Sequence, residues 1–339
     1  MARIALDAMG GDHAPRATVA GALLALAELD SAHSIQLVGQ TAVVEKQLRF
    51  LLDGEFAAHA VHRDRLGIVE APDIIEMTDK PSAAVRGKPN SSMVVGLRMQ
   101  TDGRSDGFVS AGSTGAQMAA SMVILRLHAG VKRPAIVTLF PSARKKVAVL
   151  DSGANVDCSA EELVQFARLG AIYAECVLGR VNPAVGLLSI GEEPEKGNAV
   201  TKETHPLLLQ SGLNFIGNVE GRDLPAGGTE HQEVDVVVCD GFVGNVILKF
   251  YEGVAPLMME TLRGAGVNEE QLAAGLKHLD YSEHGGAPLL GVKGVSIIAH
   301  GKSSPRAIKN ALKVAVQAVM SGMNDQIGQR LGVATESAA

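Results

Sequence analysis

Short apolar runs alternate with segments of helical periodicity along most of the chain. Arg3–Asp7 is the first apolar run and predicts a β-strand. Pro15–Leu29 follows, with apolar residues such as Val19 and Leu23 at the spacing of one helix face. The same reasoning predicts further strands at Ser34–Val38, Gly67–Glu70, Gly107–Ser110, Ala135–Phe140, Val147–Leu150, Val185–Ile190, Asn214–Gly217, Val234–Cys239 and Val295–His300. It predicts further helices at Asn90–Gln100, Thr114–Leu127, Ala160–Leu178, Ala199–Gln210 and Pro305–Met320.

This alternation also predicts the fold class. Strands joined by helices imply a mostly parallel sheet with helices on both faces, a three-layer α/β/α architecture. Ala135–Phe140 and Val147–Leu150 lie close together in sequence, which suggests an antiparallel pair. No linker or repeat divides the sequence, so residues 1–330 are predicted to form a single α/β/α catalytic domain and residues 331–339 a flexible tail. Gly253–Gly286 holds two helical patterns without a strand, which predicts a projecting helical hairpin.

Composition and charge argue against several classes of protein. The chain has 339 residues, of which 46% are hydrophobic, and can bury a large core. Its net charge of −6 argues against nucleic-acid binding. The three cysteines form no C-x-x-C pair and residues 1–8 lack the features of a signal peptide, so we expect a cytoplasmic protein. No apolar run approaches the ~20 residues that a membrane-spanning helix needs.

Glycine-containing loops follow several of the predicted strands. They are Asp7–Pro15 (DAMGGDHAP), Ser110–Gly115, Asp151–Asn155, Gly191–Gly197, Asp240–Asn245 and His300–Ser304. At the carboxyl ends of parallel strands such loops form a ligand crevice, because glycine permits close backbone approach and helix N-termini offer N–H groups to an anion. One such loop alone is more often a simple turn or helix cap. A row of them on one edge of one sheet predicts a polar binding crevice.

Several more specific motifs are absent from the sequence. No G-x-G-x-x-G follows a strand, and Ser296 stands where a P-loop ending in Gly301-Lys302-Ser303 would need its first glycine. Ser113 follows Ala111-Gly112, so no G-x-S-x-G elbow is present. No histidine pair or cysteine cluster has the spacing of metal ligands. We therefore predict neither a cofactor nor a metal site.

Charged residues in these loops have both structural and chemical interpretations. His13 is a candidate base and Asp12 its orienting partner, although capping of the first helix is slightly favoured for Asp12. Asp151 and Asp240 end apolar strands, where bonding to the N–H groups of the next loop is about as well supported as catalysis. Lys196 would normally be solvated, and only its place in the row of loops makes it a candidate.

Ordered motifs give the chain a family resemblance. They are DAMGGDHAP, Ser91-Ser92-Met93, Ser110–Gly115, Leu150-Asp151 with Gly153–Asp157, Lys196-Gly197-Asn198, Gly217–Glu220, Asp240-Gly241-Phe242 with Gly244-Asn245, and Gly285–Gly291. From about Arg3 to Met320 the sequence resembles the bacterial acyl-ACP:phosphate acyltransferases. The resemblance implies reversible transfer of a fatty acyl group from acyl carrier protein to inorganic phosphate, giving an acyl phosphate for glycerophospholipid synthesis. It also implies a fold related to the isocitrate/isopropylmalate dehydrogenases and the phosphotransacetylases.

The resemblance implies partners as well. It implies a homodimer, and acyl carrier protein as the donor. The apolar stripe of Val254, Leu257, Met258 and Leu262 predicts that the 253–286 hairpin lies at or near the dimer interface. The resemblance also implies a membrane glycerol-3-phosphate acyltransferase as the consumer of the product, and peripheral membrane association as an option for a cytoplasmic enzyme. Two basic groups, Arg126 with Lys132-Arg133 and Arg144–Lys146, are candidate docking sites for the acidic carrier.

The site residues follow from this reaction. Phosphate is already an ionised nucleophile and a thiolate leaves readily, so the site mainly needs anion binding. The expected catalytic residues are Lys196 for the phosphate and developing charge, Asn245 for the oxyanion, and Asp12 and His13 for organising the first loop. The expected phosphate- or substrate-binding residues are Gly10, Gly11, Gly112, Ser113, Thr114, Gly115, Asp151, Asn155, Asp240 and Gly244.

Some points stay open at this stage. Relatives often carry Asn at the positions of Ser113 and Ser189 and Thr at the position of Val243, so roles for those side chains are undecided. Two other functions are compatible with the same crevice. They are an acyl- or phosphate-binding regulatory protein and a dehydrogenase of the related fold.

Overall fold

The computed structural model describes residues 1–268, 271–272 and 285–336. The chain divides into two compact units: Met1–His128 with Ser282–Asn324 form unit 1, and Ala129–Tyr281 with Asp325–Ala339 form unit 2. The prediction of a single catalytic domain over residues 1–330 is not tested by this division and stays a prediction.

Unit 1 contains a mostly parallel sheet. Its strands follow the order β3-β2-β1-β4-β12-β11. They are β1 (Arg3–Asp7), β2 (Ser34–Gly39), β3 (Leu66–Glu70), β4 (Gly107–Ser110), β11 (Ala287–Leu290) and β12 (Ser296–Ile298). β1 is parallel to β2 and β4, and β4 is parallel to β12, whereas β11 is antiparallel to β12. The carboxyl ends of β1, β4 and β12 therefore share one edge of the sheet.

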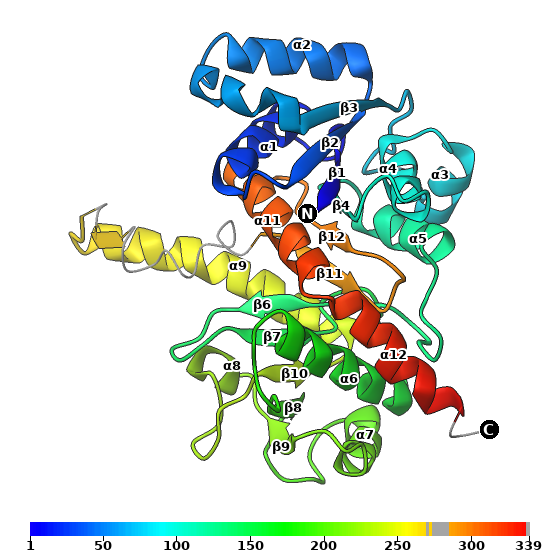
Figure 1. Ribbon diagram of the computed structural model, residues 1–339. Coiled ribbons are helices and arrows are strands. Elements are labelled where there is room, and N and C mark those ends of the chain that lie inside the picture. Colours follow the sequence, from blue (N-terminus) through cyan, green and yellow to red (C-terminus); the bar gives the residue numbers. More distant parts are fainter. Residues whose placement is uncertain (269–270, 273–284, 337–339) are drawn as a thin grey trace. The chain divides into compact units, whose positions relative to one another are not determined.

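Helices cover both faces of this sheet (Figure 1). They are α1 (Arg16–Glu28), α2 (Thr41–Leu52), the 3-10 helix η1 (Ala57–Arg65), α3 (Pro81–Gly87), α4 (Ser92–Thr101), α5 (Thr114–Ile124) and α11 (Pro305–Met320). α1 and α11 lie on one side of the sheet, and α4 and α5 lie on the other. α1 contributes the fully buried Val19, Leu23 and Leu26 to the core, as its apolar spacing predicts.

Unit 2 has its own sheet in the order β6-β7-β10-β8-β9. Its strands are β6 (Thr138–Phe140), β7 (Val147–Leu150), β8 (Val185–Leu188), β9 (Phe215–Val219) and β10 (Val236–Val238), and the short β5 (Ala135–Ile136) precedes them. Its helices are α6 (Ala160–Cys176), α7 (Ala199–Leu209), α8 (Asp223–Ala226), α9 (Gly241–Gly264) and most of α12 (Met323–Glu336). β10 is parallel to β7 and β8, so these three strands end at one edge.

The unit 2 sheet is packed between α6 and α9. On one face, a Cβ atom added to Gly170 of α6 would lie 2.6 Å from the side chain of Val236, so α6 approaches the sheet closely there. Val237, the next residue of β10, belongs to a buried cluster on which Val243 and Ile247 of α9 pack. Because successive side chains of a strand point to opposite faces, these contacts define the three layers.

The sequence predicts much of this architecture correctly. The mostly parallel α/β class is confirmed, and β1, β4, β7 and α11 have the predicted bounds. The predicted strand Ala135–Phe140 is instead two short strands, β5 and β6, and β6 is antiparallel to β7. The helix α2 was not predicted, although Val44, Leu48 and Leu51 are spaced along one helix face and are buried.

Three further expectations need adjustment. The strands that precede the glycine-containing loops belong to two sheets rather than one, with the ends of β1, β4 and β12 in unit 1 and of β7, β8 and β10 in unit 2. The first part of the predicted hairpin 253–286 continues α9, while residues 269–270 and 273–284 lie outside the described residues. Residues 331–336, expected in a tail, belong to α12. No helix among the described residues combines the length and apolarity needed to cross a membrane.

A carboxylate links the two helices on one face of unit 1. A Cβ atom added to Gly21 of α1 would lie 2.5 Å from the Cβ atom of Ile308, so α1 and α11 approach closely. At the end of α1, Lys309 and Lys313 each donate to Glu28 at 2.7 Å. These two hydrogen bonds lower the pKa of Glu28 to about 2.

We predict that this contact gives unit 1 a pH-dependent stability. A carboxyl group whose pKa is lower in the folded state stabilises that state at pH values above the ordinary pKa of the group. This contribution to stability is lost as the pH falls from about 5 through about 2. Because the Glu28 side chain is 44% exposed, solvent screening limits the effect to less than about 1 kcal/mol. Urea unfolding of Glu28→Gln should show a destabilisation at pH 6 that shrinks at pH 3. A constant difference at both pH values would contradict the assignment.

Candidate active site

A buried carboxylate organises the loops of unit 1. Asp7, the last residue of β1, is 2% exposed. Its Oδ2 atom accepts a hydrogen bond from Ser110 Oγ at 2.7 Å, and its Oδ1 atom accepts one from the Met9 N–H group at 3.1 Å. Ser110 Oγ in turn accepts from the Gly112 N–H group at 3.0 Å. Burial raises the pKa of Asp7, and hydrogen bonds, including those of Ser92 and Ser110, oppose the rise.

Glycines let three loops of unit 1 meet. A Cβ atom at Gly10 would lie 2.5 Å from Asp7 Oδ2 and 2.9 Å from the Gly112 nitrogen, so no larger residue fits there without a shift. Gly11 has a φ of +104°, a conformation that favours glycine. The next residue, Asp12, donates its N–H group to the Gly301 carbonyl at 2.8 Å. The loops after β1, β4 and β12 are thereby joined at one edge of the sheet.

The side chains of Asp12 and His13 are exposed at this edge. The favoured interpretation of Asp12 as a helix cap is wrong: α1 begins after Pro15, and among the described residues no side chain caps it. Both side chains are therefore available to a ligand, and their roles stay a prediction.

The segment that follows β4 has two functions in the fold. Ser113 caps α5, because its Oγ atom accepts from the Ala116 N–H group at 3.4 Å. Thr114 lies exposed in the first turn of α5. A Cβ atom at Gly115 would lie 2.9 Å from Pro81 Cγ, so this glycine also permits close packing of α5. The positions predicted to bind phosphate thus form a helix N-terminus, a favourable place for an anion.

A second buried carboxylate organises the loops of unit 2. Asp151 is fully buried directly after β7. It accepts N–H hydrogen bonds from Ile136 at 2.9 Å, from Ala154 at 3.2 Å and from Asn155 at 2.6 Å, and a further bond from Asn155 Nδ2 at 2.9 Å. Burial raises the pKa of Asp151, and these donors oppose the rise. Asp151 therefore holds N–H groups of the next loop, as its structural interpretation predicts, and Asn155 is one of its donors.

The start of α9 is seated on this loop. The Asp240 side chain caps the helix by accepting from the Val243 N–H group at 2.8 Å. The Gly241 N–H group donates to the Asn155 carbonyl at 2.7 Å. A Cβ atom at Gly244 would lie only 1.9 Å from the Asp151 carbonyl oxygen. The segment Asp240–Asn245 is therefore a helix N-terminus rather than a free loop, and its glycines allow α9 to contact the Asp151 backbone.

Two exposed polar side chains lie beside this framework. Asn245, in the second turn of α9, has its Cβ atom 3.5 Å from where a Cβ atom of Gly153 would be. Lys196 is exposed, and its stem covers Gly191, whose added Cβ atom would lie 2.9 Å from Lys196 Cγ. No carboxylate of the described residues lies within ion-pair distance of the Lys196 ammonium group, which leaves that cation available to a ligand.

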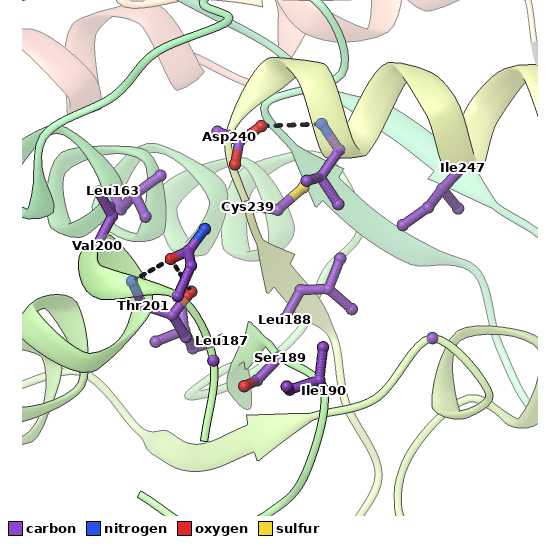
Figure 2. A pocket seen from close by; sticks show the side chains of 14 residues that line it. Leu163, Leu187, Leu188, Ser189, Ile190, Val200, Thr201, Cys239, Asp240 and Ile247 are labelled. Carbon is purple, nitrogen blue, oxygen red and sulfur yellow. Dashed lines mark hydrogen bonds between the residues drawn. The ribbon is translucent and has the colours of Figure 1, made fainter. Parts of the chain in front are cut away.

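A cavity of about 310 Å³ lies in unit 2 next to these residues (Figure 2). Its lining comprises Leu163, Leu187, Leu188, Ser189, Ile190, Gly197, Asn198, Val200, Thr201, Gly221, Cys239, Asp240, Val243 and Ile247. Most of these side chains are apolar, and they come from β8, α6, α7 and the first turns of α9. Sequence analysis did not identify this cavity, because its walls are assembled from segments far apart in the chain.

The structure groups the predicted site residues by unit. Gly10, Gly11 and Gly112 meet in unit 1, and Asp151, Asn155, Asp240, Gly244 and Asn245 meet in unit 2. Sequence analysis missed Asp7 and Ser110 as site-forming residues, although each ends a strand directly before a glycine-containing loop. Among the described residues, no group of three or more His, Cys, Asp or Glu side chains could hold a metal ion.

Comparisons with known proteins extend over nearly the whole chain. A family described as "Fatty acid synthesis protein" matches residues 2–326. A phosphate acyltransferase of Desulfitobacterium hafniense is 48% identical over 98% of both chains. A phosphotransacetylase of Streptococcus pyogenes has a similar fold, with a TM-score of 0.63, 18% identity and 94% of each chain covered. A 4-hydroxythreonine-4-phosphate dehydrogenase of Klebsiella pneumoniae gives a TM-score of 0.54 at 11% identity, covering 94% of this chain and 100% of its own.

The contact between Gly244 and the Asp151 backbone generates a prediction. Gly244→Ala should lower the free energy of unfolding by about 3 kcal/mol or more, because the new methyl group would overlap a backbone oxygen. Gly253→Ala in the same helix meets no atom within 4 Å and should raise stability by about 0.5–1 kcal/mol. Urea unfolding of both variants checks this contrast, and equal stability of the two would disprove the close seating of α9.

Proposed function

The chain belongs to the fatty acid synthesis protein family, and we propose that it moves a fatty acyl group from acyl carrier protein to inorganic phosphate through the loops described above. The phosphate acyltransferase relatives, 48% identical over almost the full length, support the reaction class. The protein is an acyltransferase of phospholipid synthesis. The observation that carries the site assignment is the exposed Lys196 cation, which has no ion pair among the described residues and lies two residues before Asn198, the N-cap of α7.

The reaction needs no strong base. A phosphate oxygen attacks the thioester carbonyl carbon, a C–O bond forms, and the tetrahedral intermediate carries an oxyanion. The C–S bond then breaks, and the thiolate leaves with the electron pair and takes a proton from solvent. The protein must bind phosphate and stabilise the oxyanion, which positioned N–H groups and one cation accomplish.

We assign these tasks to the exposed polar groups rather than to the buried carboxylates. Lys196 neutralises phosphate and the charge that develops on it, and the Asn245 amide donates to the oxyanion. Gly11 and residues 113–115 supply backbone N–H groups for an anion, with Asp12 and His13 bordering that loop. The N–H groups of Gly10 and Gly112 are bonded to Asp7 and Ser110, so these two glycines shape the loop instead. Asp151 and Asp7 act through the positions that they give these loops.

We propose acyl carrier protein as the donor because the surface carries exposed basic side chains that can bind an acidic protein. Arg144 and Lys146 are exposed, whereas Lys145 forms ion pairs with Glu233 at 2.9 Å and Asp235 at 2.7 Å and so stabilises the fold. Arg133 is likewise occupied by Glu162 at 2.9 Å. Each of the two basic groups expected from the sequence therefore keeps two exposed cations for an acidic carrier, Arg144 and Lys146 in one and Arg126 and Lys132 in the other.

The product also suggests where the enzyme acts. An acyl phosphate is a reactive anhydride with a long apolar chain, so we propose that it passes to a glycerol-3-phosphate acyltransferase in the membrane. The enzyme would then work in the cytoplasm, at least partly near the membrane surface.

The function and the role of Lys196 share one test. Purified protein with acyl carrier protein thioester and phosphate should form acyl phosphate, trapped as the hydroxamate. Lys196→Ala should lower kcat by about 10²–10³, the usual cost of losing a transition-state donor, without changing stability. Lys202→Ala, an exposed lysine on α7, is the matched control and should keep full activity. Failure of the unmodified protein would reject the function, while an active Lys196→Ala would reject only the assignment of Lys196.

An apolar stripe on α9 supports a homodimer. Phe242, Val246, Phe250 and Leu257 lie along one face of the helix, and each is more than half exposed. A lone helix cannot bury such a face, so we propose that it packs against a second copy of the chain. The stripe begins closer to the site than the hairpin residues 253–286 that the sequence indicated.

Sedimentation at micromolar concentration should show a dimer, and Phe250→Glu should give a monomer because it places a charge in the interface. Val181→Glu changes a valine that is 95% exposed elsewhere in unit 2 and should leave the dimer intact. A monomeric unmodified protein would contradict the proposal. If that monomer bound phospholipid vesicles through Phe250, the stripe would be a membrane-binding face instead.

A further inference from the structure

The cavity in unit 2 is suited to an uncharged, elongated apolar group. Leu163 and Val200 lie on one side of it and Ile190 and Ile247 on the other (Figure 2). Burying one methylene against such walls favours binding by a roughly constant increment. Ile190 lines the cavity while being 80% exposed, so the cavity reaches the protein surface there.

The charge of the lining disfavours an anion inside the cavity. Asp240 is the one ionised side chain among the described lining residues, and it is negative. Its Oδ1 atom is occupied by the Val243 N–H group at the start of α9. The Asn198 Oδ1 atom also has its partners within the protein, because it accepts from both the N–H and the hydroxyl group of Thr201. Phosphate therefore belongs outside the cavity, near Lys196, and a neutral chain belongs inside.

Two lining residues of the cavity adjoin one of the proposed catalytic groups. Gly197 and Asn198, which line it, directly follow Lys196 in sequence. A chain in the cavity would thus have its thioester carbon near the loop that carries Lys196.

We propose that this cavity binds the acyl chain of the substrate and sets the chain length that the enzyme prefers. The inference rests on the proposed function and adds to it the residues that select the substrate. A cavity of about 150 Å³ accommodates a six-carbon ring, so 310 Å³ gives room for roughly twelve carbons. Longer chains would extend past Ile190 to the surface.

The expected signature is a chain-length profile. In competition assays with carrier thioesters of four to sixteen carbons, the ratio of kcat/KM values isolates the chain, because the carrier is the same throughout. Each added methylene should raise kcat/KM about fourfold until roughly twelve carbons, after which the profile should level off. A flat profile would overturn the inference.

Two substitutions on different helices should shorten the acyl chain that the enzyme prefers. Val200→Phe on α7 and Ile247→Phe on α9 each fill part of the cavity and should reduce kcat/KM for the twelve-carbon donor by at least tenfold while sparing the four-carbon donor. Leu209→Phe, on α7 but 65% exposed and outside the cavity, is the matched control and should leave the profile unchanged. The two variants alter opposite walls of the cavity. If one of them fails to fold, the other still tests the proposal.

The outcomes separate this inference from the proposed function. If the unmodified protein forms no acyl phosphate from any donor, the proposed function fails. If it forms acyl phosphate but neither Val200→Phe nor Ile247→Phe shortens the preferred chain, the chain binds elsewhere and only the inference fails.

Discussion

A carboxylate without access to solvent, that of Asp151, holds together the loops at one edge of the unit 2 sheet. Removing a charged group from water is costly unless hydrogen bonds replace those of the solvent. Asp151 meets this requirement through donors from β5, from its own loop and from Asn155. The same loop receives α9, because Gly241 donates to the Asn155 carbonyl. The positions of the 151–155 loop and of the start of α9 therefore depend on the hydrogen bonds to one carboxylate.

Unit 1 also contains a buried carboxylate that is stabilised by hydrogen-bond donors. Asp7 ends a parallel strand and is saturated by donors from Ser110 and from its own turn. In both units the buried acid lies next to a region expected to receive an anionic substrate. Donation by N–H and O–H groups to each carboxylate disperses its charge, while glycines keep the surrounding backbone close. These hydrogen bonds explain how Asp7 and Asp151 can lie next to regions expected to bind an anion, where basic residues would otherwise be expected.

The sequence was informative where local pattern decides the structure. Continuous apolar runs predicted β1 and β7 because both faces of those strands are buried. The role of Asp7 was missed because its partner Ser110 is 103 residues away. Gly244 was recognised as important, but the reason, a backbone oxygen of Asp151, cannot be read from spacing. The cavity was missed for the same reason, since α6, α7 and α9 each contribute only part of its wall.

One helix, α9, extends from the proposed site of unit 2 to an exposed apolar surface. α9 has 24 residues, so it extends about 36 Å from its seat on Asp151, with the exposed Phe250 and Leu257 along its length. A ligand at the proposed site beside the start of α9 and a partner on the exposed face of the same helix are subject to thermodynamic linkage. If a partner on the outer face changes the substrate affinity of the site proposed beside Asn245, then substrate changes the affinity for that partner by the same factor.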